Sequence, residues 1–298
     1  WGQGGGPFST ASNWRIYENT LELTKQGTDP AAVVIEHGHR AGLEVFLSMR
    51  VNDIHDGMYL GELNDPLMSP MKQSHPDWLL GGTGRSRFSY NFSLPEVREY
   101  RLGLAMEAIN NYDIDGLDWD FCRYPVLFRS GEVEDGERLI TETIQRLRDT
   151  LDEKSARIGR QLLLSIRVPG GLSETLSAGI DVETLVRDKL IDILIVGHAI
   201  GNKHRLPVEE YVQVAEGSKV EVIAQNLGLF MQGRPWSARM LWGERDYYST
   251  EMCRATAAAH WRAGADGIYL FNNHLISVAR DLAYNRQPWK EIADPQLI

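Results

Sequence analysis

The sequence contains no long hydrophobic run. A membrane-spanning helix needs roughly 20 consecutive apolar residues, and no stretch of the 298-residue chain has that length. A basic cluster is also missing and the formal net charge is −10, so we expect no nucleic-acid partner. No signal peptide is visible, but the chain opens on Trp1 rather than Met, and we expect the numbering to start inside a longer protein.

Cysteine is scarce, because the chain holds only Cys122 and Cys253. The first falls in a predicted strand and the second in a predicted helix, so we expect two free thiols rather than a disulfide. This leaves the cellular compartment open, with a periplasmic or secreted location as the preferred interpretation. Hydrophobic residues make up 43% of the chain, as in a globular protein with a full core.

Apolar segments that alternate with helical patterns predict a parallel α/β fold. A (β/α)8 TIM barrel takes roughly 250 residues and eight strands, so we expect one such barrel domain over residues 1–298. Its first strand is expected to be irregular or to lie upstream of residue 1. The strands that the sequence itself predicts are 43–49, 87–91, 114–121, 162–168, 191–196, 220–224 and 266–271.

Short motifs mark where several elements begin. Asp29 is the expected N-cap of a helix that starts at the following proline. Ser93 and Glu96 have the spacing of a capping box. Residues 112–116 and 263–267 repeat one pattern, because each ends a helix, continues with Asp-Gly and leads into an apolar strand.

The predicted strand 114–121 carries acids where a strand interior is normally apolar. Side chains alternate between the two faces of a strand, so Asp118, Asp120 and Cys122 share one face. The apolar residues between them, such as Trp119, share the other face and are expected to pack against a helix. Two carboxylates aimed at one space repel each other, an arrangement typical of catalytic centres. The alternative is a pair of acids at a solvated strand end.

This strand resembles two families of carbohydrate-active enzymes. Residues 115–120, Asp-Gly-Leu-Asp-Trp-Asp, are similar to the Asp-Gly-x-Asp-x-Asp-x-Glu strand of family 18 chitinases, although Cys122 stands at the place of the proton-donating Glu. A wider likeness, over roughly residues 30–125, is to the bacterial family-10-like glycosyl hydrolases. The segments that carry it are 42–46, 75–80, 95–100 and 112–116. This resemblance implies a glycan-directed enzyme on a (β/α)8 barrel, with the strand ending in an acid at Asp120.

A barrel gathers the carboxyl ends of its strands at one rim, where such enzymes place their chemistry. Many polar side chains are expected at this rim, which suits a polyhydroxylated carbohydrate substrate. Trp78 lies in the long connection 57–86, which either covers a substrate groove with His75 or is a packed surface insertion. The predicted substrate-binding residues are Arg50, Asn52, His55, Trp78, Arg123, Tyr124, Arg167, His198, Asn226, Asn272 and His274.

Glycoside hydrolysis normally needs two carboxyl groups. Asp120 is the predicted nucleophile or base, because its strand position and the family resemblance both select it. Asp118, one layer deeper, is expected to orient it or to share a proton with it. Cys122 is expected to be a packing residue. The candidates for the second catalytic acid are Asp53, Asp56, Glu244 and Asp246.

Two other functions stay open. A polysaccharide lyase would use His or Tyr with Arg and needs no second carboxylate. A non-catalytic glycan-binding barrel would explain Cys122 in place of a Glu. Arg123 and Arg167 are suited to an anionic sugar such as a uronate or a sulfated one, although Arg123 has the alternative of pairing with the acidic strand.

No cofactor or metal is predicted. No helix carries a His-Glu-x-x-His pair, and the one metal-binding alternative would be a convergence of Asp53, His55 and Asp120. The expected partner is therefore a carbohydrate substrate, while the oligomeric state stays open.

Overall fold

The computed structural model describes residues 11–57, 63, 68–198, 206–227, 250–271 and 287–298. The chain divides into two compact units, which we describe separately. The first contains Trp1–Ser165 and Ser177–Ile180, and the second contains Ile166–Leu176 and Asp181–Ile298. Across the described ranges, no helix is long and apolar enough to cross a membrane.

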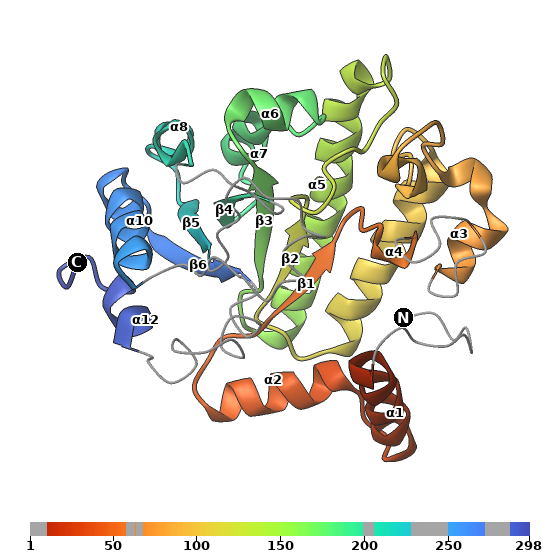
Figure 1. The fold of residues 1–298 in the computed structure, drawn as a ribbon, viewed down its shortest axis with the longest axis horizontal. Helices are drawn as coiled ribbons and strands as arrows, with labels where there is room; N and C mark the ends of the chain where they lie inside the picture. The colour runs from red at the N-terminus through yellow and green to blue at the C-terminus, as the bar shows by residue number, and fades with distance from the viewer. Residues whose placement is uncertain (1–10, 58–62, 64–67, 199–205, 228–249, 272–286) are drawn as a thin grey trace, which may run out of the picture. The chain divides into compact units, whose positions relative to one another are not determined.

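The first unit is built around two parallel strands, β1 (Phe46–Arg50) and β2 (Gly116–Asp120). Figure 1 shows them side by side, and their register runs from Phe46 opposite Gly116 to Arg50 opposite Asp120. The third strand, β3 (Leu163–Pro169), begins in this unit beside β2. The helices of this unit are α1 (Ala11–Lys25), α2 (Pro30–Arg40), η1 (His55–Gly57), α3 (Pro70–Ser74), η2 (Pro76–Trp78), η3 (Arg85–Phe88), α4 (Pro95–Asn111) and α5 (Val133–Ile158).

Two predicted helix starts have different outcomes. Asp29 is the N-cap of α2, because its carboxylate accepts a hydrogen bond from the N–H of Ala32 at 2.9 Å. The predicted capping box of Ser93 and Glu96 is wrong. Helix α4 begins one residue after Leu94, which has no side-chain cap, since the proline at the first position fixes where the helix starts.

The apolar face of β2 is fully covered, as its alternation predicts. Leu117, Trp119 and Phe121 are at most 2% exposed. Helix α4 contacts this strand and packs along α5. Every residue of β2 is buried, including its two acids, so the strand keeps carboxylates inside the protein on one face and a hydrophobic core on the other.

The repeated Asp-Gly pattern has a structural explanation. Asp115 donates its backbone N–H to the carbonyl oxygen of Val45, and its carboxylate accepts the N–H of Val45 at 2.7 Å. Asp266 forms the same pair of bonds with Val222, whose N–H donates to the carboxylate at 2.8 Å. Each Asp therefore ties the beginning of its own strand to the beginning of the preceding one. The following Gly116 has no Cβ because the Phe46 ring fills that space.

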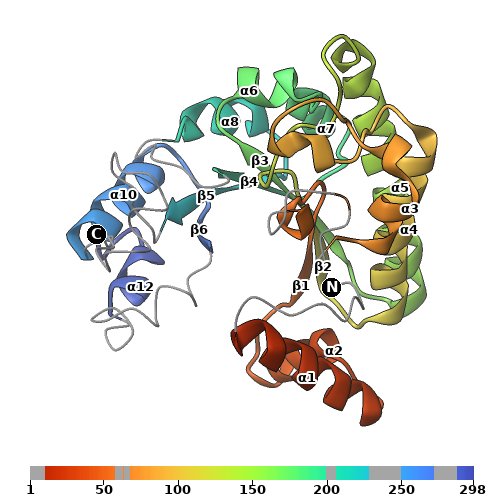
Figure 2. The same ribbon diagram turned by 45° about the vertical axis from the view of Figure 1, so that its right-hand side comes forward.

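The second unit continues the parallel arrangement with β4 (Ile193–Gly197), β5 (Glu221–Leu227) and β6 (Gly267–Phe271). Helices α8 and α10 contact β5, and Figure 2 shows α10 beside α12. The Trp261 indole N–H donates to the Ile292 carbonyl at 2.9 Å, where the two helices meet. Within the described residues of this unit, the helices are α6 (Leu172–Ser177), α7 (Val182–Arg187), α8 (Val208–Ala215), α10 (Thr250–Arg262) and α12 (Gln287–Ile292).

The predicted parallel α/β fold is confirmed, with the strands in the sheet order β1-β2-β3-β4-β5-β6. One predicted strand is wrong. Residues 87–91 include the end of the short helix η3, and Tyr90 forms only an isolated antiparallel bridge with Leu79. The backbone of Tyr90 is hydrogen-bonded to a side chain, so it is not available for a continuous ladder. The eight-strand closure of the barrel stays a prediction, since residues 1–10 lie outside the described ranges.

Candidate active site

The acids of β2 lie on a face whose side chains form levels along the strand. At the lowest level the Phe46 ring covers Gly116. At the next level Asp118 accepts two hydroxyl hydrogen bonds, from Ser48 on β1 at 2.5 Å and from Ser165 on β3 at 3.0 Å. Asp118 is only 5% exposed. A carboxylate with a donor on each oxygen is satisfied in its ionised form.

Asp120 is one level higher, at the last residue of β2, and it is 3% exposed. Its Oδ1 accepts the backbone N–H of Cys122 at 2.8 Å, and its carbonyl oxygen accepts the N–H of Val51 at 2.9 Å. The carboxylate is thereby fixed at the point where β2 gives way to its loop. Cys122 is fully buried, and both cysteines are free thiols, as expected.

The loop after β1 places a carboxylate–imidazole pair at the same end of the two strands. Oδ2 of Asp53 accepts a hydrogen bond from Nη1 of Arg50 at 2.6 Å. Oδ1 contacts Nδ1 of His55 and also accepts the backbone N–H of His55 at 2.8 Å. Burial alone would raise the pKa of Asp53, but the bonds from His55 and Arg50 outweigh it and the pKa is lowered. Asp53 is therefore ionised at neutral pH.

The loop after β2 contributes two side chains, Arg123 and Tyr124, that contact the His55 ring. Nη2 of Arg123 lies 2.6 Å from Nε2 of His55, and the ring of Tyr124 stands edge-on to the imidazole with centroids 5.9 Å apart. Since a guanidinium only donates, this contact makes Nε2 the acceptor, and the tautomer that fits it carries its proton on Nδ1, facing Asp53. Tyr124 has φ 58°, in the left-handed region. Non-glycine residues with such strain are concentrated at functional sites.

Asn52 joins the loops that surround these residues. It is 1% exposed, and its amide N–H₂ donates to the carbonyl oxygens of Tyr90 at 3.0 Å and Val126 at 2.9 Å. Its own Oδ1 accepts the N–H of Tyr90 at 2.7 Å. The amide of this predicted substrate-binding residue is thus engaged with backbone, which supports a positioning role.

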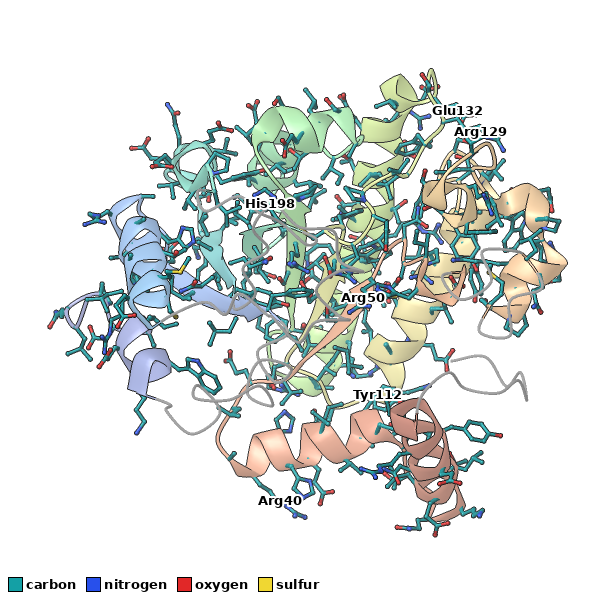
Figure 3. All side chains as sticks on the ribbon, viewed as in Figure 1. Arg40, Arg50, Tyr112, Arg129, Glu132 and His198 are labelled. Carbon is teal, nitrogen blue, oxygen red and sulfur yellow. The ribbon has the colours of Figure 1, made fainter. Side chains whose placement is uncertain are left out.

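A second set of bonds holds the same loops further out. Arg129 donates to the carbonyl oxygens of Leu79 and Leu80, each at 3.1 Å. Glu132 accepts from the backbone N–H of Arg129 and from the side-chain amide of Asn91, each at 3.2 Å. Figure 3 shows Arg129 and Glu132 close together on the loop before α5. These hydrogen bonds therefore join three segments into one frame, namely the loop after β1, the loop after β2 and the connection before α4.

Two residues that the sequence did not indicate, Lys72 and Arg101, hold the backbone of the site in place. Lys72 is 2% exposed, and its ammonium donates to Asp56 Oδ1 and to the carbonyl oxygen of Asp53, each at 2.9 Å. Burial lowers the pKa of Lys72, and Asp56 opposes that shift. Asp56, a candidate second acid, is therefore in an ion pair. Arg101 donates to the Arg50 carbonyl at 2.6 Å. A lysine normally indicates a solvated surface, so the sequence contained no signal for this pair.

Trp78 lies in a packed aromatic group. Its ring stacks on His75 at 4.2 Å, with 16° between the planes, and lies 6.0 Å from the ring of Tyr100 on α4. One indole face is therefore occupied by a neighbour. This geometry supports the packed-insertion interpretation of the 57–86 connection over sugar stacking at Trp78.

The second unit holds its own set of predicted residues. Arg167 is fully buried, and its guanidinium donates to Oε1 of Gln225, at 2.6 Å from Nη2, and to the carbonyl oxygen of His198 at 2.9 Å. The guanidinium also lies 4.2 Å from the centroid of the Phe271 ring. The Asn226 amide donates to the Cys253 carbonyl at 3.0 Å.

His198, which Figure 3 labels, is 8% exposed. Four further predicted residues lie outside the described ranges, namely Asn272, His274, Glu244 and Asp246. Within the described part of the chain, no group of three or more His, Cys, Asp or Glu side chains is arranged to hold a metal ion.

The fold is similar to that of solved protein domains. The structure of the PgaB (BpsB) glycoside hydrolase domain from Bordetella bronchiseptica superposes with a TM-score of 0.54 at 11% identity, covering 86% of this chain and 77% of that one. A family 18 N-acetylglucosaminidase from Paenibacillus barengoltzii gives a TM-score of 0.48 at 14% identity, over 82% of both chains.

The sequence is also similar to known proteins. Residues 7–144 match the family Glycosyl hydrolase-like 10. Glycosyl hydrolase YngK of Bacillus subtilis (strain 168) is 27% identical over 125 residues, or 41% of this chain. The match covers 23% of that relative, so the chain corresponds to about a quarter of it. The predicted resemblance to family-10-like hydrolases is thereby confirmed.

Proposed function

We propose that the chain is a glycoside hydrolase that cleaves O-glycosidic bonds of an oligo- or polysaccharide, with Asp120 as nucleophile or general base. The observation that carries the proposal is the buried carboxylate of Asp120 at the end of β2, oriented by the N–H of Cys122. The match of residues 7–144 to a glycosyl hydrolase-like family supports the same reaction class.

Asp118 acts as a positioning residue in this proposal. Its two oxygens are engaged by Ser48 and Ser165, so it is held as a fixed negative charge one level below Asp120. Such a charge stabilises positive charge that develops on the sugar ring.

Asp53 is suited to orient His55 rather than to donate a proton. Its lowered pKa keeps it ionised, whereas a general acid must carry a proton at the working pH. A carboxylate that fixes the tautomer of an imidazole is a recurring arrangement in enzymes. We therefore assign Asp53 the role of orienting the imidazole of His55 in the active site.

A polysaccharide lyase is the second candidate, and one observation favours it. His55, Tyr124 and Arg123 lie together at the ends of two loops, and these are the residue types that such a reaction uses. A lyase abstracts a proton next to a carboxylate and leaves an unsaturated product. It would proceed without Asp120 as nucleophile.

A glycan panel with product analysis tests these functions together. A hydrolase releases new reducing ends without ultraviolet absorption, whereas a lyase releases an absorbing, unsaturated end. Asp120→Asn is expected to fold normally and to lose turnover by roughly 10³-fold or more. Asp149→Asn, on the exposed face of α5, is the matched control and is expected to keep full activity. Glycan binding without depletion of any substrate would identify a non-catalytic binding barrel instead.

A further inference from the structure

The imidazole of His55 has both ring nitrogens engaged. Nδ1 contacts Oδ1 of Asp53, and Nε2 faces Nη2 of Arg123 at 2.6 Å. The lone pair of Nε2 is therefore covered by a group that only donates. His55 is able to exchange a proton with a substrate only after Arg123 has moved.

We propose that an anionic substituent of the glycan, a carboxylate or a sulfate, binds Arg123, draws its guanidinium away from His55 and so uncovers Nε2. The inference rests on the proposed function, because it concerns the same site. A guanidinium forms two parallel, charge-assisted hydrogen bonds with a carboxylate, and these are stronger than one bond to a neutral imidazole. The substrate class is thus an acidic glycan.

The surroundings of Arg123 allow this exchange. Arg123 is 5% exposed, but the side chain of His55 is 38% exposed and the ring of Tyr124 is half-buried. The Arg123 guanidinium lies 6.0 Å from the centroid of the Tyr124 ring. A sugar that lies against these two rings therefore brings its substituent next to a buried cation.

His55 keeps its orientation when Arg123 leaves. Oδ1 of Asp53 is bonded to both the ring and the backbone N–H of His55, and Oδ2 is held by Arg50. These contacts do not include Arg123. The exchange therefore exposes Nε2 of an imidazole that is already positioned, which couples recognition of the acidic group to the availability of a proton acceptor.

Calorimetric binding tests the substrate class with matched ligands. The probes are oligogalacturonate, hyaluronan oligosaccharides and a sulfated glycan, each beside its methyl-esterified or desulfated counterpart. We expect at least one acidic form to bind more tightly than its neutral counterpart. Arg123→Gln is expected to weaken that binding about 10- to 100-fold, the loss of a charge-assisted hydrogen bond, and to leave binding of the neutral form unchanged.

Two variants separate this mechanism from a general effect of charge. Arg146→Gln removes an exposed arginine that pairs with Glu99 on the helices, and it is expected to change nothing. His55→Ala removes the group that competes for Arg123, so the acidic ligand is expected to bind equally well or better. If Arg123→Gln fails to fold, Arg123→Lys tests the bidentate contact instead, because it keeps the charge but loses the planar fork. It is expected to weaken binding of the acidic form less than the loss of the whole charge would, and to leave binding of the neutral form unchanged.

A nitrogen NMR spectrum of the His55 ring reports the exchange directly. The Nε2 resonance is expected to move when the acidic ligand is added and to stay in place with the neutral one. Equal binding of both forms by every probe, or an unchanged Nε2 signal with the acidic ligand bound, would overturn the inference. Cleavage of neutral glycans alone would overturn it and keep the hydrolase, whereas acidic binding without any cleavage would keep it and overturn the hydrolase.

Discussion

The hydroxyl of Ser48 donates to Oδ2 of Asp118 at 2.5 Å, across the register of β1 and β2. Ser48 is itself exposed, while Asp118 is buried. The buried carboxylate of Asp118 therefore receives a hydrogen bond from a residue that is itself exposed. Ser165 completes the arrangement from β3.

Ser48→Ala is expected to lower the free energy of unfolding by about 1–2 kcal/mol, because one oxygen of a buried carboxylate loses its donor. Urea unfolding measures this loss. Ser74→Ala is the control, since the Ser74 hydroxyl bonds only to the backbone of its own exposed helix. A variant as stable as the wild type would mean that water replaces the hydroxyl at Asp118.

Asn52→Asp tests the frame of loops around the site. The new carboxylate would face the carbonyl oxygens of Tyr90 and Val126, which now accept two amide hydrogen bonds. Two lost bonds and a buried charge are expected to cost about 3 kcal/mol or more. Asn110→Asp makes the same change on the exposed surface of α4, and its melting temperature is expected to stay close to that of the wild type.

The sequence predicted the two faces of β2 because local patterns determine them. Alternation along β2 places Asp118 and Asp120 on one buried face, and the helices between the strands indicate parallel βα units. Residues 87–91 were harder to predict. Their alternation resembles a strand, but the backbone of Tyr90 is bonded to Asn52, 38 residues earlier. Such a partner cannot be read from the segment itself.

The supporting residues show the same limit. Lys72 stands in a short segment with no clear apolar periodicity, and its partner Asp56 is 16 residues away. The Asp53–His55 contact is local and was within reach of the sequence, whereas the approach of Arg123 from another loop was not. The pattern of residues within one helix or strand predicts which face is buried. Contacts between distant loops become visible only when the three-dimensional structure is known.

Lys72→Ala is expected to destabilise the protein by about 3–5 kcal/mol, since it leaves Asp56 without its buried cationic partner. Lys25→Ala is the control, because Lys25 forms an exposed ion pair with Glu22, and exposed pairs contribute about 0–1 kcal/mol. The double variant Lys72→Met with Asp56→Asn is expected to recover part of the loss. Thermal unfolding of the wild type, the two single variants Lys72→Met and Asp56→Asn, and the double variant would show whether the pair is coupled.

The lowered pKa of Asp53 predicts how stability depends on pH. Its folded-state pKa is below the unfolded value of about 3.9. Its contribution is therefore complete above that unfolded value and is lost as the pH falls through the folded pKa. Asp53→Asn lacks this contribution, so the difference in unfolding free energy between wild type and variant is expected to shrink on acidification. A difference that grows below pH 4 would contradict the assignment.

Cys122 is expected to be a packing residue, although it follows the two acids on the same face of the strand. It is fully buried and forms no disulfide, and its backbone N–H already serves to orient Asp120. A thiol near carboxylates is a weak nucleophile, because negative neighbours disfavour the thiolate. Cys122→Ala is therefore expected to retain most activity on any glycan that the wild type cleaves. Loss of turnover with an intact fold, or inactivation by a thiol reagent that substrate prevents, would mean that the thiol takes part in the reaction.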